Sequence, residues 1–193
     1  NSGAIMVTGN RIGGIIGYAN KTTTMVAATN SGVITGGGTS QDVGGIIGYA
    51  KEKVTATGAL LNKANIKASN NIGGIIGTAM STMELYTLTN EATLVEATST
   101  EKGFVGGIIG SANDNVKVSA NMINRAEVSA KFDYVGGAIG QIIGNLSCIN
   151  AYNYGVVETE GSYVGGIVGF ANSRAAGAYI SIDVTSSMYN EGN

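Results

Sequence analysis

A six-residue segment occurs six times along this chain of 193 residues. Each copy consists of Ile or Val, two glycines, two aliphatic residues and a third glycine, as in Val43 to Gly48. The copies are 29 to 33 residues apart, counted between their first glycines, which are Gly13, Gly44, Gly73, Gly106, Gly136 and Gly165. A period of about thirty residues is typical of repeat proteins, in which each unit buries its apolar face only against its neighbours. Because the repeat continues without a linker, we predict a single repeat-array domain over residues 1–193.

A second element begins 17 or 18 residues after the first glycine of each of the first five segments. It consists of Asn, any residue, Gly or Ala, any residue and an aliphatic residue, as in Asn62 to Ile66. Its asparagines are Asn30, Asn62, Asn90, Asn124 and Asn153. In stacked units these side chains would form a structural amide ladder that satisfies its own hydrogen bonds and those of the turn. A polar binding row is the alternative, and the Gly or Ala of a tight corner favours the ladder.

Three runs in each unit have the two-residue alternation of β-strands: the glycine segment, the run before the Asn and the run after it. No stretch has a 3.6-residue period over eleven or more residues. The predicted fold is therefore all-β, a β-solenoid of about six coils with three short strands per coil. A propeller is the alternative, but its blades need roughly forty residues each.

Both ends of the chain lie at the same phase of the repeat. Asn1 to Ile5 match the Asn element, and Asn190 to Gly192 match its first half. This predicts a fragment of a longer array, or a unit whose ends stack on each other. The last unit is longer than the others, which predicts an insertion around Ser173 to Tyr179.

The composition argues against several classes of function. Charged residues make up 12% of the chain, against roughly 25% in an average globular protein. The net charge is −2 and no Lys/Arg cluster occurs, so we expect no nucleic-acid partner. Apolar stretches reach about five residues, far short of the roughly twenty of a membrane-spanning helix. Cys148 is the single cysteine, so an internal disulfide is excluded.

The residues of the chain also argue against catalysis. The absence of His removes Ser-His pairs, Cys-His pairs and imidazole metal sites. The 13 acidic residues do not cluster, and the closest pair, Glu158 and Glu160, is expected at a solvated corner. We therefore predict that the protein is not an enzyme and has no cofactor or metal.

The glycine segment is apolar on both of its alternating faces. A solenoid wall has one inner and one outer face, so we expect Val43 and Ile47 to point inward and the Gly-Ile-Gly-Ala stripe that contains Ile46 to point outward. Exposed apolar patches often form contact surfaces, which makes this stripe a candidate contact wall. The residues at the second position of this stripe in the six copies are Ile15, Ile46, Ile75, Ile108, Ala138 and Ile167. The alternative is that the same chain or a neighbouring domain covers both faces.

The recurring V-G-G-I-I/V-G-Y/F-A strand, paired with Asn-x-Gly/Ala-x-Val/Ile, resembles the GLUG-type repeats of bacterial surface proteins over essentially the whole chain. The resemblance implies a secreted, cell-surface repeat region with a spacer, adhesive or scaffolding role, and it carries over no catalytic residues. These repeats often carry Cys or an aromatic residue before the Asn, and here only Cys148, Tyr152 and Tyr189 do.

The expected function is that of a non-enzymatic extracellular structural or adhesive module that acts through its flat wall and stackable ends and self-assembles into filaments. Its expected partners are further copies, neighbouring repeats, a host protein or a glycan. The alternative is a carbohydrate-binding or carbohydrate-processing β-helix, which a groove holding two acidic and several exposed aromatic residues would favour. The position after each glycine segment is aromatic in three of six units, with Tyr18, Tyr49, Thr78, Ser111, Gln141 and Phe170 along the series.

Overall fold

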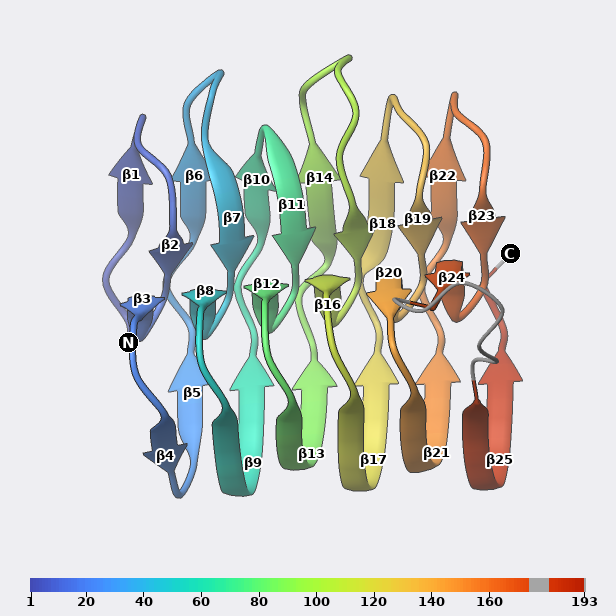
Figure 1. The fold of residues 1–193 in the computed structure, drawn as a ribbon. Helices are drawn as coiled ribbons and strands as arrows, with labels where there is room; N and C mark the ends of the chain where they lie inside the picture. Colours follow the sequence, from blue (N-terminus) through green and yellow to red (C-terminus); the bar gives the residue numbers. More distant parts are fainter. Residues whose placement is uncertain (174–180, 193) are drawn as a thin grey trace.

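The computed structural model describes residues 1–173 and 181–192. Within these residues the chain forms parallel β-strands, β1 to β25, and no helix. Successive coils lie side by side from the N-terminus to the C-terminus (Figure 1). The predicted all-β solenoid of about six coils is confirmed, with a period of about thirty residues. Most of the predicted insertion, residues 174–179, lies outside the described residues.

Four parallel sheets run along the solenoid. Sheet A contains β1 (Ile5–Val7), β6 (Ile34–Gly36), β10 (Ile66–Ala68), β14 (Leu94–Ala97), β18 (Glu127–Ala130) and β22 (Val157–Thr159). Sheet B contains β2 (Ile12–Gly13), β7 (Gln41–Gly44), β11 (Asn70–Gly73), β15 (Val105–Gly106), β19 (Val135–Gly136) and β23 (Val164–Gly165). Sheet C contains β3 (Ile16–Ala19), β8 (Ile47–Ala50), β12 (Ile76–Ala79), β16 (Ile109–Ala112), β20 (Ile139–Ile143) and β24 (Val168–Asn172). Sheet D contains β4 (Thr23–Met25), β5 (Ala28–Asn30), β9 (Val54–Asn62), β13 (Met83–Asn90), β17 (Val116–Asn124), β21 (Leu146–Asn153) and β25 (Ile182–Asn190).

The glycine segment forms two strands in each coil, where the sequence predicted one. In the second coil β7 ends at Gly44, the chain bends at Gly45 and Ile46, and β8 begins at Ile47. The bend transfers the chain from sheet B to sheet C. A typical coil therefore has four strands and not three.

Two apolar cores result from this arrangement. Sheets A and B supply one core, which includes Ile66 and Ile72. Sheets C and D supply the other, which includes Ile47 and Leu60. Each fully buried aliphatic side chain contributes about 1.5–3 kcal/mol relative to an exposed one, so both cores stabilise the stack.

The bend also corrects the prediction of an exposed contact wall. Ile46, Ile75, Ile108 and Ala138 are fully buried in the core of sheets C and D, and Ile167 is 7% exposed. Only Ile15, in the first coil, is exposed, at 44%. Adjacent residues such as Ile46 and Ile47 both enter this core because the change of direction interrupts the alternation of a straight strand. The alternative interpretation holds, since the same chain covers both faces.

The asparagines of the second element form a continuous ladder between the two cores. Each side-chain Nδ2 donates to Oδ1 of the next asparagine: Asn30 to Asn62 at 2.9 Å, Asn62 to Asn90 at 2.9 Å, Asn90 to Asn124 at 3.0 Å and Asn124 to Asn153 at 2.8 Å. All five side chains are buried. Asn1 and Asn190 extend the ladder at its two ends, through hydrogen bonds of 2.9 and 2.7 Å. No face of the ladder is open to a ligand, because its amides bond to each other and to the adjoining turns.

Candidate functional site

Sheets B and C meet at a corner on the outer surface, which we call the front corner. A Cβ atom placed on Gly48 of sheet C would lie 2.5 Å from the backbone nitrogen of Ile12 and 2.6 Å from the carbonyl carbon of Arg11. Sheet C therefore lies directly against the beginning of sheet B. The strands that form this corner lie toward the viewer in Figure 1.

Two columns of side chains line the front corner along the solenoid axis. The first column is the residue immediately before each glycine segment: Arg11, Asp42, Asn71, Phe104, Tyr134 and Tyr163. The second column is the third residue of each sheet C strand: Tyr18, Tyr49, Thr78, Ser111, Gln141 and Phe170. The columns are seven residues apart in sequence, and the fold brings them into contact across the corner.

Backbone strain recurs in the first column. Five of its six residues have a positive φ: 61° at Arg11, 58° at Asp42, 52° at Asn71, 68° at Tyr134 and 59° at Tyr163. Residues other than glycine pay about 1–2 kcal/mol for this left-handed conformation, although Asn and Asp tolerate it better than most. Arg and Tyr have no such tolerance, so their side chains must be held there by other interactions.

In the N-terminal half of the corner, the charged side chains of the two columns contact neighbouring side chains of the same columns. The Arg11 guanidinium lies over the rings of Tyr18 and Tyr49, at 4.5 and 4.8 Å from their centroids. The Asp42 carboxylate accepts hydrogen bonds from Thr78 Oγ1 at 2.6 Å and from Asn71 Nδ2 at 3.1 Å. Burial, and then the nearby Asp42 carboxylate, raise the pKa of Tyr49 above its usual value. These contacts stabilise the corner and leave little unpaired charge for a ligand.

The middle of the corner is polar and closed. Gln141 Nε2 donates to Ser111 Oγ at 3.2 Å, and Asn113 Nδ2 lies 3.3 Å from the same oxygen. Thr78, Ser111 and Gln141 are all buried. This part of the corner is filled by the protein's own side chains.

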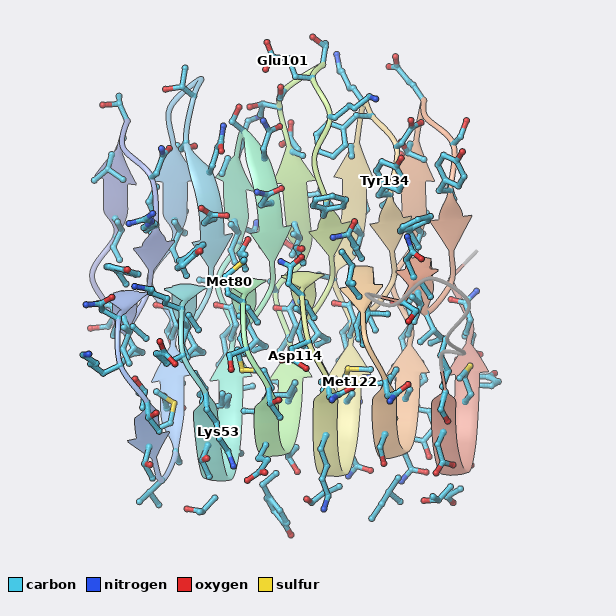
Figure 2. The ribbon with its side chains drawn as sticks, in the orientation of Figure 1. Lys53, Met80, Glu101, Asp114, Met122 and Tyr134 are labelled. Carbon is cyan, nitrogen blue, oxygen red and sulfur yellow. The ribbon has the colours of Figure 1, made fainter. Side chains whose placement is uncertain are left out.

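The C-terminal half of the corner is aromatic. Tyr134 and Tyr163 stack with centroids 4.9 Å apart and planes 7° from parallel. Phe104 lies 5.4 Å from Tyr134 on the other side, and Phe170 meets both tyrosines edge-on at 5.1 and 5.8 Å. Each such pair contributes about 0.5–1.5 kcal/mol beyond burial, enough to offset much of the strain at the two tyrosines. We call these four residues the aromatic cluster, and Figure 2 labels Tyr134 within it.

The aromatic cluster is partly open to solvent. Tyr163 is 54% exposed, and the other three rings are partly exposed. Within the described residues, neither the Tyr134 hydroxyl nor the Tyr163 hydroxyl has a protein hydrogen-bond partner. The cluster therefore presents ring edges and free hydroxyl groups.

Sequence reasoning found only one of the two columns. The second column is aromatic at three of its six positions, which by itself is weak support for a sugar-binding surface. The first column adds Phe104, Tyr134 and Tyr163. The signal was present in the residue before each glycine segment, but only the bend between sheets B and C places that residue opposite the second column.

Other reactive groups lie apart from the corner. Glu158 and Glu160 border a polar cleft with Lys131 and Thr159. Cys148 is buried in the core of sheets C and D, and burial raises the pKa of its thiol to about 11. Among the described residues, no group of three or more His, Cys, Asp or Glu side chains is placed to hold a metal ion.

Comparisons with family models, with curated proteins and with solved structures find no match to this chain. In the part of the chain that the structure describes, no helix has the length and apolar character to cross a membrane. The functional argument therefore rests on the geometry of the solenoid and of its front corner.

Proposed function

We propose that this chain is a non-enzymatic, extracellular structural or adhesive repeat module, a stiff spacer that makes lateral contacts through its front corner. The amide ladder is the observation that carries the proposal. It runs without interruption from Asn1 to Asn190 beside four parallel sheets, so every coil is hydrogen-bonded to the next at several points. Such coil-to-coil bonding resists bending and shear, as a spacer requires.

The contact surface in this proposal differs from the one that the sequence predicted. The Gly-Ile stripe is buried and has no surface to offer a partner. The front corner replaces it, because it combines exposed aromatic rings with a strained backbone, a combination that frequently accompanies binding sites. The extracellular location is supported by the resemblance of the repeat to bacterial surface proteins.

Stiffness can be tested by measuring one distance along the axis. Thr24 and Asp183 are exposed, and they occupy the same register position of sheet D in its first and last coils. We would replace both by Cys in a Cys148→Val background, attach spin labels and measure their separation by pulsed electron resonance. Five coil spacings of about 4.8 Å put the two backbones roughly 24 Å apart.

A narrow distance distribution around this value, unchanged in mild denaturant, is expected for a stiff spacer. A broad or bimodal distribution under native conditions would contradict the spacer role. Single labels at Thr24 and at Asp183, whose continuous-wave spectra report the mobility of each label, provide the control for the width that the labels themselves introduce.

A further inference from the structure

We propose that the aromatic cluster of Phe104, Tyr134, Tyr163 and Phe170 binds a neutral glycan chain lying along the solenoid axis. This inference rests on the adhesive role proposed above and assigns a ligand class to the same corner. Three observations carry it: the strain at two tyrosines, the absence of charge in this half of the two columns, and the small size of the exposed aromatic surface.

The strain indicates that the rings themselves are needed. Tyr134 and Tyr163 have φ values of 68° and 59°, in a conformation that Gly or Asn adopts at less cost. Asn71 occupies the equivalent position two coils before Tyr134 with a φ of 52°. The fold therefore accepts a small amide at this position, and the tyrosines are not required by the backbone.

The chemistry of the cluster fits a neutral ligand with both apolar and hydroxyl-rich surfaces. In the last three coils the two columns consist of Phe104, Tyr134, Tyr163, Ser111, Gln141 and Phe170, none of which is charged. The exposed ring edges carry the positive part of the aromatic quadrupole and can contact sugar oxygens, and the free tyrosine hydroxyls can exchange hydrogen bonds with sugar hydroxyls. The charged members of the columns, Arg11 and Asp42, are confined to the opposite half and are already paired.

The size of the cluster favours a narrow chain over a folded protein. Four fully exposed aromatic side chains would offer roughly 600–1,000 Å² in total. Only Tyr163 is about half exposed and the other three are less so, which leaves less than half of that area. A stable protein–protein interface needs about 800 Å² on each partner. A glycan running over the stacked rings of consecutive coils needs only a narrow strip.

The test is native electrophoresis through gels that contain one polysaccharide each: hydroxyethylcellulose, xylan, galactomannan or, as the anionic comparison, polygalacturonate. We expect at least one neutral polysaccharide to retard the wild-type chain. The double variant Tyr134→Asn/Tyr163→Asn should lose at least about tenfold in affinity, which means that its dissociation constant rises by about one decade or more. Asn71→Tyr, which extends the column by one ring, should increase retardation.

The control variant is Tyr154→Asn, which removes a partly exposed ring stacked with Tyr152 and placed under Arg125, away from the front corner. It should be retarded like the wild type. Circular dichroism establishes that each variant is folded, and Asn71→Tyr remains informative if the double variant is not.

The proposal is overturned if no neutral polysaccharide retards the wild type, if the double variant is retarded equally, or if only polygalacturonate has an effect. Dimerisation that the double variant abolishes, without any retardation, would instead assign the rings to a second copy of this chain. None of these outcomes affects the measured stiffness of the solenoid, so failure of the glycan proposal and failure of the spacer proposal can be distinguished.

Discussion

Gly45 lies directly against the side chain of Asn62. A Cβ atom on Gly45 would fall 2.5 Å from Asn62 Cγ and closer still to the carbonyl oxygen of Gly74. The same relationship joins the second glycine of each later segment to its ladder asparagine: Gly74 to Asn90, Gly107 to Asn124, Gly137 to Asn153 and Gly166 to Asn190. The two recurring elements of the sequence therefore form one structural unit, the narrow waist between the two cores.

This contact predicts that Gly45→Ala is severely destabilising. The added methyl group meets the backbone of the next coil, which cannot move without breaking parallel hydrogen bonds on both sides. We expect a loss of about 3 kcal/mol or more in the free energy of unfolding, at the upper end of overpacking effects. Urea unfolding followed by circular dichroism measures it. Gly38→Ala is the matched control, because nothing lies within 4 Å of the new methyl group. If both variants unfold at the wild-type midpoint, the waist is looser than this contact implies.

Interrupting the amide ladder should be nearly as costly. Asn90 Nδ2 donates to Asn124 Oδ1 at 3.0 Å and to the Gly107 carbonyl oxygen at 2.8 Å, and its Oδ1 accepts from Asn62 Nδ2 at 2.9 Å. Asn90→Ala removes one hydrogen bond from each of these buried partners, so that Asn62 Nδ2 keeps only its bond to Ala64 and Asn124 Oδ1 only its bond from Ala126. Each unsatisfied group costs about 1–3 kcal/mol. We expect a total loss of about 3 kcal/mol in thermal or urea unfolding.

The control for the ladder is Asn65→Ala. The Asn65 side chain also accepts several hydrogen bonds, from Thr93 and Leu94, but at an exposed position. Water can replace those bonds, so the loss should be about 1 kcal/mol or less. Equal losses for the two variants would mean that burial of the ladder contributes nothing.

The coil and the ladder could be predicted because both depend only on register. Once units of about thirty residues stack, Asn62 and Asn90 must lie one above the other, whatever the exact path between them. The orientation of Ile46 depends on something else, the change of direction at Gly45 and Ile46. Period-two alternation assumes a straight strand, and a glycine pair lets the backbone bend and reverse the phase of the next strand. This is why the stripe expected outside lies inside.

The aromatic cluster was missed for a related reason. Tyr134 precedes its strand and contacts Phe170, a residue of the next coil that stands at a different position of the repeat. Sequence comparison of equivalent positions finds columns, but it does not find which two columns face each other. Only the angle between sheets B and C determines that pairing.

We expect Cys148 to cause a specific decrease in the free energy of unfolding at high pH. Burial raises the pKa of its thiol from 9.0 to about 11, so the folded state holds the proton more tightly than the unfolded state does. The thiol's contribution is fully present below pH 9 and is lost as the pH rises from about 9 to about 11. The size of the effect is at most about 2–3 kcal/mol, at 1.4 kcal/mol per pKa unit.

The comparison variant for this titration is Cys148→Val. The equivalent residue in the preceding coil is Val118, so valine fits the position. Tyrosines and lysines also titrate in this range, and the difference between wild type and variant isolates the cysteine. Urea midpoints at pH 8 and pH 10.5 should separate the two proteins only at the higher pH. In parallel, a thiol reagent should label native Cys148 far more slowly than the unfolded chain, and fast native labelling would contradict the burial.

The first coil predicts association between copies of this chain. Among the described residues, its strands β1, β2, β3 and β4 have a neighbour on one side only, and Met6 and Ile15 there are 78% and 44% exposed. Unpaired parallel strand edges beside exposed apolar residues favour pairing with another solenoid end. Light scattering over a concentration series should therefore give a mass that rises above 19.5 kDa.

Ile15→Lys places a charge on this surface and should keep the chain monomeric. Tyr86→Lys removes a ring that is also about half exposed, but on the side of the third coil, and should leave association unchanged. A wild-type mass that stays at 19.5 kDa, or equal suppression by both lysine variants, would mean that the open edge does not drive assembly.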